Sequence, residues 1–235
     1  DTFSSRGLGD VYKRQANSHV TAADFDNDGD LDLMAGYQSG RFYYFENTGT
    51  AVAPQFAVAV QNPFGLYDIG QHSAPTAVDI DNDGDFDIMA GKNSGFFYYF
   101  ENSGTPSSPS FDSAQINAFG LYDAGTQTVP RFADLDNDSD LDILLGNQTG
   151  AFYYFENSGS LSAPQFDSTQ INPFGLTSAS SNSSPTIYDL DEDGDLDLFS
   201  GSISGNLLYY ENIGTATSPA FTAYQINPFN LVDIG

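Results

Sequence analysis

The sequence of 235 residues contains no cysteine and only six lysine and arginine residues. Without cysteine there is no disulfide framework, thiolate metal site or cysteine nucleophile, so carboxylate oxygen is the main ligand chemistry available. The six basic residues stand against 32 aspartate and glutamate residues, which gives a formal net charge of -26. A surface this negative repels phosphate backbones and anionic lipid headgroups. We therefore expect neither nucleic acid nor membrane insertion among its interactions.

Long apolar runs are also missing. No run approaches the ~18 residues of a membrane span, and no charged and then apolar leader opens the sequence. Hydrophobic residues nevertheless make up 40% of the chain. That fraction is enough for the core of one domain or of a short array, so a disordered chain is excluded.

An internal repeat of 55 residues organises the chain. Acidic nonapeptides open at Asp24, Asp79, Asp134 and Asp189, and each interval between them is 55 residues. Four whole units are therefore expected, at residues 16–70, 71–125, 126–180 and 181–235. Residues 1–15 match no unit and contain three of the six basic residues, which predicts a non-native or unstructured leader. We expect the natural N-terminus, with any signal peptide, to be missing.

Each unit reads as four short strands. In the second unit, apolar runs at 75–78, 86–90 and 96–100 are separated by turn residues, and a fourth strand is expected within 109–119. Helical periodicity is absent from every unit. The sequence predicts an all-β, propeller-like array of four blades, each a four-stranded antiparallel sheet of 55 residues. It could close as a small propeller, but we expect an open fragment of a larger propeller, with apolar blade edges open to self-association.

An aromatic run recurs in the predicted third strands, at residues 42–45, 97–100, 152–155 and 207–210. It does not alternate with polar residues, so both faces of the strand must be covered. That situation is typical of a strand between two neighbouring blades. Sugar-stacking platforms are the alternative, but a feature present in every unit favours a core role.

The nonapeptides have the composition of calcium-binding loops. Calcium takes six to eight hard oxygen ligands, and carboxylates at alternate positions of a tight loop converge on one point. Loop positions one, three, five and nine would supply side chains, position seven a backbone carbonyl, and glycine at position six the turn. Up to four Ca²⁺ ions are predicted. The candidate ligands are Asp24, Asp26, Asp28, Asp30, Asp32, Asp79, Asp81, Asp83, Asp85, Asp87, Asp134, Asp136, Asp138, Asp140, Asp142, Asp189, Asp191, Asp193, Asp195 and Asp197.

Two alternatives to bound calcium are weaker, and an EF-hand type of calcium site is excluded. A solvated acidic turn would leave four or five carboxylates repelling one another within nine residues. Magnesium demands stricter octahedral geometry and retains its waters. An EF-hand needs an acidic residue at loop position twelve, where this chain has Ala35, Ala90, Leu145 and Ser200. Within the set, the third site is expected to be the weakest, because Ser139 replaces the position-six glycine and a left-handed non-glycine residue costs ~1 kcal/mol.

An Asp-x-Asp-x-Asp-Gly-Asp-x-Asp loop inside a strand hairpin, once per blade, resembles the FG-GAP/VCBS repeat family over residues 16–235. The resemblance implies a calcium-stabilised propeller, extracellular or on the cell surface, that is used for adhesion or ligand binding. It indicates fold and metal more strongly than function.

The variable residues point to a ligand surface. Variation concentrates in the turns between the second and third strands, on the face opposite the acidic loops, where Arg41, Lys92 and Arg131 are also expected. Such a polar face is either a binding surface or tolerated loop variation. The histidines, His19 and His72, are expected at the surface, without a catalytic partner. The candidate ligand-binding residues are Tyr37, Arg41, Lys92, Asn147, Gln148 and Asn206.

Two functions fit these features. The first is a non-enzymatic, calcium-binding adhesion or binding module that recognises glycan or an extracellular protein through the face opposite the calcium loops. The alternative is a non-catalytic accessory propeller of a secreted polysaccharide-active enzyme. An enzyme in its own right is disfavoured, because Glu46, Glu101, Glu156 and Glu211 recur in every unit whereas catalysis needs one site.

Overall fold

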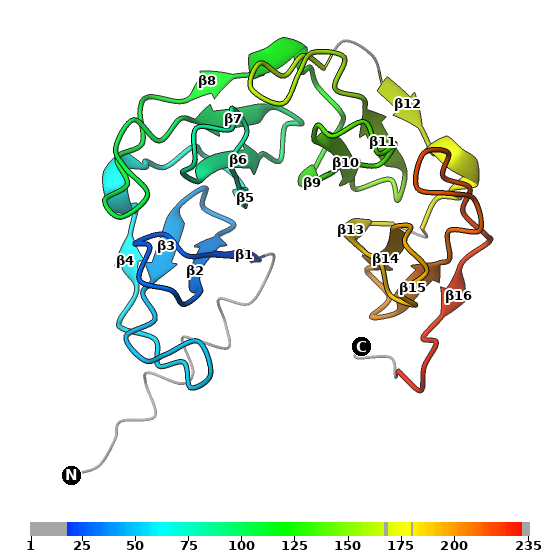
Figure 1. The fold of residues 1–235 in the computed structure, drawn as a ribbon, viewed down its shortest axis with the longest axis horizontal. Coiled ribbons are helices and arrows are strands. Elements are labelled where there is room, and N and C mark those ends of the chain that lie inside the picture. The colour runs from blue at the N-terminus through cyan, green and yellow to red at the C-terminus, as the bar shows by residue number, and fades with distance from the viewer. Residues whose placement is uncertain (1–17, 167–168, 180, 232–235) are drawn as a thin grey trace.

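The computed structural model describes residues 18–166, 169–179 and 181–231, and these residues form four antiparallel sheets of four strands each (Figure 1). The predicted leader at residues 1–15 lies outside the described residues. No helix in the described part of the chain is long and apolar enough to cross a membrane. The strands of the first two blades are β1 (His19–Ala23), β2 (Asp32–Gly36), β3 (Phe42–Phe45), β4 (Val60–Gln61), β5 (Ala74–Val78), β6 (Asp87–Gly91), β7 (Phe97–Phe100) and β8 (Gln115–Ile116). Those of the last two are β9 (Val129–Ala133), β10 (Asp142–Gly146), β11 (Phe152–Phe155), β12 (Thr169–Ile171), β13 (Ser184–Tyr188), β14 (Asp197–Gly201), β15 (Leu207–Tyr210) and β16 (Gln225–Ile226).

Within each blade the strands pair in chain order, from the inside of the array to the outside. Figure 1 shows β1, β5, β9 and β13 along the inner rim of an arc, with β4, β8, β12 and β16 on its outer rim. In the second blade the register pairs Ala74 with Gly91 and Ile88 with Phe100. This is the meander expected of a propeller blade, and it confirms the predicted fold class.

The fourth strand of each blade is shorter than the sequence predicts. Only β8 (Gln115–Ile116) forms within the expected range 109–119, because the chain then enters a short 3₁₀ turn at Ala118–Gly120. Equivalent turns follow β4 at Pro63–Gly65 and β12 at Pro173–Gly175. Before the first of them, left-handed Asn62 accepts the Phe42 N–H through its side chain at 3.0 Å. The recurrent Asn-x-Phe motif therefore anchors the outer strand to the third strand.

The aromatic third strand serves two interfaces, as its sequence predicts. In β7, Phe97 and Tyr99 pack in the cluster shared with the third blade, whereas Phe100 and Tyr98 pack in the cluster shared with the first. Successive side chains of a strand point to opposite faces, so alternate residues join different neighbours. Three such clusters lie at the three junctions between consecutive blades.

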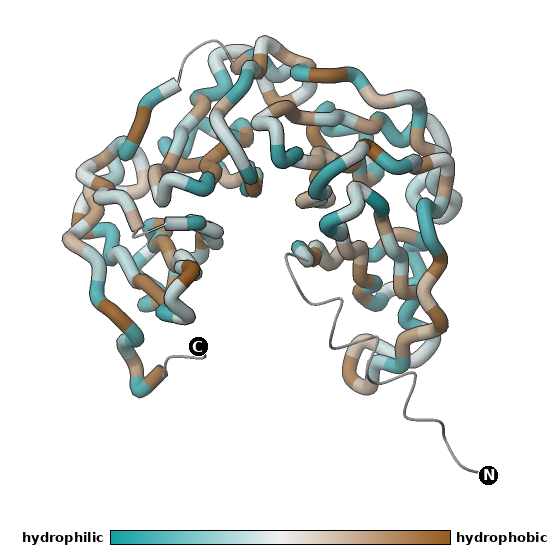
Figure 2. Tube along the Cα trace, turned by 180° about the vertical axis from the view of Figure 1, so that it is seen from behind, coloured by the Kyte–Doolittle hydropathy of each residue, from teal (hydrophilic) through white to brown (hydrophobic). Residues whose placement is uncertain are grey.

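The array is an open arc. Figure 1 shows the first and fourth blades at its two ends, and among the described residues no hydrophobic cluster joins them. Figure 2 shows the same arc from behind, with apolar residues spread through all four blades, the two end blades included. Each end blade therefore presents one side of its sheet that no other blade covers.

Candidate metal centres and the opposite face

Each acidic loop connects the first two strands of a blade and closes on its own first aspartate. The Asp24 carboxylate accepts the backbone N–H groups of Asp28 at 3.1 Å and Gly29 at 3.0 Å. Asp28 in turn accepts the Asp30 N–H at 3.1 Å. The fourth and sixth loop residues hold the backbone in the left-handed region, as at Asn27 with φ 56° and Gly29 with φ 97°. These bonds draw the backbone into a tight loop with the carboxylates inside.

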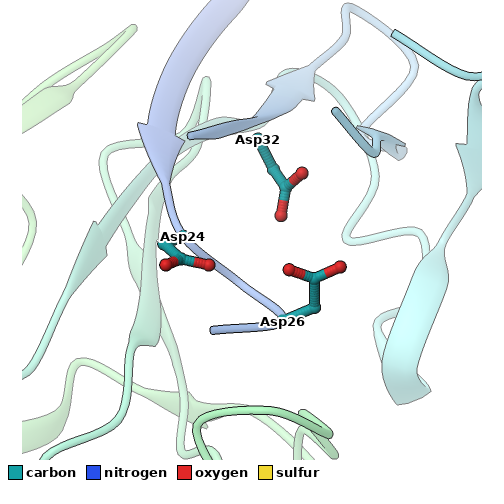
Figure 3. Close-up of side chains that lie close together, drawn as sticks. All are labelled: Asp24, Asp26 and Asp32. Carbon is teal, nitrogen blue, oxygen red and sulfur yellow. The ribbon is translucent and has the colours of Figure 1, made fainter. Parts of the chain in front are cut away.

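The aspartate side chains converge, as the alternate spacing predicts. In the first loop, one carboxylate oxygen each of Asp24, Asp26 and Asp32 lies within 4.8 Å of the others. Figure 3 shows these three side chains directed towards one shared space. The other three loops bring together positions one, three and five instead, namely Asp79, Asp81 and Asp83, then Asp134, Asp136 and Asp138, and then Asp189, Asp191 and Asp193.

Several buried carboxylate oxygens in these loops have no hydrogen-bond donor among the described residues. At position seven, Oδ1 of Asp30, Asp85, Asp140 and Asp195 is buried and unpartnered. At position three the same holds for Asp26, Asp81 and Asp136. A buried anionic oxygen without a donor is costly, so these atoms fit a cation as their missing partner. The position-seven side chains are therefore candidate ligands in addition to the backbone carbonyl that the sequence assigns there.

The aspartate carboxylates within each loop repel one another. Burial, together with the neighbouring aspartates, raises the pKa of Asp85 to about 6. The pKa of Asp81 and that of Asp136 are raised for the same two reasons. Ionising these groups side by side in the folded chain costs free energy unless a cation neutralises them.

Position nine has a second role that the spacing does not reveal. Asp87 is buried and accepts three hydrogen bonds, from the backbone N–H groups of Ile80 and Asn102 and from the Tyr99 hydroxyl at 3.0 Å. Burial raises its pKa to about 7. The same three hydrogen bonds, from a loop N–H, a tyrosine hydroxyl of the third strand and the N–H of the asparagine in the following turn, recur at Asp32, Asp142 and Asp197. The tyrosine twelve residues further on is the sequence signal that identifies this network.

The third loop has the strain that its sequence predicts. Ser139 adopts φ 81°, close to the φ 97° of Gly84 at the same position. The fourth loop departs at another position, because Glu192 takes the left-handed conformation, φ 62°, that asparagine holds in the other three loops. Both departures raise the cost of closing the loop in its native shape.

The candidate ligand residues lie on different blades, across the face opposite the acidic loops. Arg41 forms an ion pair with Asp68 at 3.3 Å, and Lys92 lies over the Tyr98 ring at 5.2 Å. The other exposed or half-buried candidates also have partners: Gln148 with Thr126, Asn206 with Ser204 and Asn227, and Tyr37 edge-on to Tyr43.

Asn147 must be removed from the ligand set. Its side chain is 1% exposed, donates to the Ala124 carbonyl at 3.2 Å and accepts from the backbone and hydroxyl of Thr149. Its backbone N–H also bonds to Ser183 of the next blade. Asn147 therefore fastens two blades together and offers no atom to a ligand.

Arg131 and the histidines also differ from expectation. Arg131 lies in the inner strand β9, where its guanidinium bonds to the Pro185 carbonyl at 3.2 Å and to the Thr76 hydroxyl at 3.2 Å. It thus links inner strands of three blades and is not part of a surface turn. His72 is buried, and the pKa of His19 falls to about 4 because of burial and the nearby Arg131 charge. For Arg131 the sequence does contain a signal. The other units have threonine at its repeat position, at 21, 76 and 186, and these positions lie in the first strand of each unit.

A polar depression of about 520 Å³ opens on the face opposite the acidic loops. Tyr37 is the one predicted ligand residue in its wall. Its other lining residues come from the first blade, from the turn between β6 and β7 and from the segments that enter the second and third blades: Gln38, Ser39, Gln71, His72, Asn93 and Gln127. Amide and hydroxyl groups, together with one aromatic ring, dominate this wall, and they suit an uncharged, hydroxyl-rich ligand.

The fold and loops define a propeller-type repeat protein with one candidate metal centre per blade. The family model for the FG-GAP-like repeat matches residues 24–90, 79–145 and 134–200. The chain belongs to the FG-GAP-like repeat family, as the sequence resemblance predicts. A search of curated protein sequences gives no match.

Two solved structures are distantly similar to this chain. Sqt1 from Saccharomyces cerevisiae is 11% identical, with a TM-score of 0.42, and the match covers 88% of this chain and 48% of that one. Sqt1 from Chaetomium thermophilum is 9% identical, with a TM-score of 0.45, and the match covers 87% and 47%. The chain spans about half the length of these two structures.

Proposed function

We propose that the chain is a non-catalytic binding module whose acidic loops hold up to four calcium ions. The observation that carries the metal assignment is the set of buried, donor-free carboxylate oxygens at loop positions three and seven. Hard oxygen donors of this number and spacing favour calcium over softer metals. The ions would neutralise the loops and hold them closed, while the rest of each blade supplies the scaffold.

Thermal unfolding tests the calcium assignment. If each site had a Kd near ~0.1 mM, then ~10 mM calcium would contribute about 2.7 kcal/mol per site. The midpoint in calcium should therefore lie well above the midpoint in EDTA. Asp83→Ala should reduce this difference more than Asp138→Ala, because the strained third loop is expected to bind more weakly. An unchanged midpoint on adding calcium would overturn the assignment.

The ligand surface is the polar depression on the opposite face, and we propose a glycan as its ligand, with the module secreted or displayed on the cell surface. Tyr37 can stack on a sugar ring, and the surrounding amides can exchange hydrogen bonds with its hydroxyls. Arg41 and Lys92 lie on the same face and would contact a larger or anionic glycan at its periphery. An extracellular protein partner would use the same surface.

A glycan array, with the chain saturated in calcium, tests this assignment. Tyr37→Ala and Gln38→Ala should each lose binding. Gln38 is exposed, so its substitution should leave the melting temperature almost unchanged, since exposed substitutions usually change stability by under about 0.5 kcal/mol. Tyr37 is half-buried and packs edge-on against Tyr43, so its substitution should also lower the melting temperature. Gln225→Ala, an exposed amide on the outer strand β16, is the matched control and should bind as the parent does. Binding that survives both substitutions but vanishes with Asp81→Ala at full folding would assign the ligand to the metal face.

A further inference from the structure

A small cavity of about 70 Å³ adjoins the polar depression. His72 and Gln127 line both spaces, so the two are neighbours. The other residues of the cavity wall lie in the inner strands of the first, third and fourth blades or in the segments that enter them: His19, Val129, Asn182, Ser183 and Ser184. All four blades therefore contribute to this wall, along the inner rim of the arc (Figure 1).

The Arg131 guanidinium lies next to this cavity. Its Nε donates to the Pro185 carbonyl and its Nη1 to the Pro130 carbonyl, each at 3.2 Å. These two prolines directly follow Ser184 and Val129, which are residues of the cavity wall. The strand β9 begins at Val129 and runs towards the third acidic loop, so Arg131 lies beyond the cavity as seen from the depression.

Arg131 brings more hydrogen-bond donors than its place between blades requires. In the second blade Thr76 holds the same repeat position, and its hydroxyl alone donates to the Pro130 carbonyl of the next blade at 2.7 Å. Arg131 makes the equivalent bond to Pro185 through Nε, and its Nη1 bonds back to the second and third blades. The two N–H groups of Nη2 make no hydrogen bond among the described residues. A threonine would join the blades, so one end of the guanidinium is left for another partner.

This positive charge has no acidic partner. No carboxylate oxygen of the described residues lies within 4.0 Å of the Arg131 nitrogens. The guanidinium stays protonated although burial lowers its pKa. Asp134, the first residue of the third loop, comes three residues later, ~10 Å along an extended chain, whereas physiological salt screens charges over ~8 Å. A half-buried cation without a counterion favours an anionic ligand.

The cavity wall offers a further donor and no negative charge. His72 is 7% exposed, and its Nε2 is buried without a hydrogen-bond partner among the described residues. The His19 ring centroid lies 6.1 Å from that of His72. Burial lowers the pKa of both histidines, and the Arg131 charge contributes at His19, so both are neutral at pH 7. A neutral imidazole can donate through Nε2, whereas a cation bound here would be repelled by Arg131.

We propose that this cavity binds the carboxylate of an acidic sugar, such as a uronic acid, whose ring lies in the adjoining depression. The cavity has room for about two water molecules at ~30 Å³ each, so it admits a carboxylate group but not a sugar ring. Arg131 Nη2 and His72 Nε2 would donate to the carboxylate, and the amides of the depression would bond to the ring hydroxyls. The identity of the ligand as a sugar rests on the proposed function, whereas the carboxylate site does not.

Acetate, the simplest carboxylate, tests the site without a sugar. The chain has two histidines, and in saturating calcium at pH ~7 their imidazole NMR signals should shift on adding acetate. Acetamide, a neutral molecule of the same shape, should leave them in place. Arg131→Thr should weaken acetate binding at least ~10-fold, the effect of losing a charge-assisted hydrogen bond. Its melting temperature should stay close to the parent's, because three other units have threonine at this position.

A second variant tests the site from the histidine side. His72→Asn should also weaken acetate binding, because it removes the buried Nε2. It should fold, since Asn182 holds the same repeat position with φ 51°, close to the φ 62° of His72. Equal shifts with acetate and acetamide, or acetate binding that both variants leave unchanged, would overturn the carboxylate site.

A pair of matched glycans tests the sugar. On an array, the parent should prefer chains that end in galacturonate over chains that end in galactose by at least ~10-fold, and Arg131→Thr should bind the two alike. A parent that binds both glycans equally and does not bind acetate would overturn this inference and leave the proposed function standing. Acetate binding that requires Arg131, with no glycan bound, would support the carboxylate site and overturn the glycan assignment.

Discussion

The buried tyrosine of each third strand gives a sharp test of the aspartate network. In the second blade, the Tyr99 hydroxyl donates to Asp87 at 3.0 Å, and the other donors to this carboxylate are the backbone N–H groups of Ile80 and Asn102. Tyr99→Phe keeps the ring and removes only the hydroxyl. A buried carboxylate then loses one of its three donors, so the variant measures how far the loop depends on the third strand.

A hydrogen bond to a charged group contributes about 1.5–3 kcal/mol. For a chain of this length, a loss of ~2 kcal/mol lowers the melting temperature by about 4–8 °C. The assay is thermal unfolding at pH ~8 in calcium, where Asp87 is ionised. Tyr98→Phe is the matched control in the same strand. Tyr98 is half-buried, and within the described part of the chain its hydroxyl has one hydrogen-bond partner, the Lys92 amine at 3.3 Å, so the loss of this hydroxyl should cost under about 0.5 kcal/mol. Equal losses in the two variants would refute the reasoning.

Two further predictions concern the loops. Ser139→Gly should raise the melting temperature of the chain and the calcium affinity of the third site, because it relieves ~1 kcal/mol of left-handed strain. Calorimetric titration of the variant and the parent tests this, and an unchanged calcium affinity would contradict it. In EDTA, the free energy of unfolding should fall as pH rises from about 4 to 7. In the folded chain the pKa of Asp85 is about 6 and that of Asp87 about 7, and both lie above the value in the unfolded chain. The folded chain therefore binds more protons in this range and loses stability as they dissociate. Calcium competes with those protons, so melting curves in saturating calcium should lose or reverse this slope, and a slope that calcium leaves unchanged would argue against metal binding in the loops.

The fold could be predicted from the sequence because its signals are local and repeated. A 55-residue period, a strand pattern and an acidic loop in each unit are sufficient to define a blade. The two-sided third strand follows from Phe97–Phe100 alone, since a strand without polar residues needs cover on both faces. The convergence of the aspartates likewise follows from alternate spacing in a tight turn.

The errors in the predicted site come from contacts between blades. Asn147 stands in a variable turn, and its burial depends on Ser183 and Ala124, which are 36 and 23 residues away. Arg131 was misplaced although its repeat position, which is threonine elsewhere, lies in the middle of the inner strand. The polar composition of a turn, as at Asn147, does not indicate whether a neighbouring blade will cover it.

Because side chains alternate along the third strand, each junction between blades is packed by a different set of its residues. Phe97 is buried in the junction after the second blade, and Phe100 is buried in the junction before it. Because neighbouring units interact only through such junctions, a single truncation can weaken one seam while the others keep their packing. A substitution at one junction should therefore make that junction the first to separate under a pulling force or to become accessible to a protease, while the blades on either side stay folded.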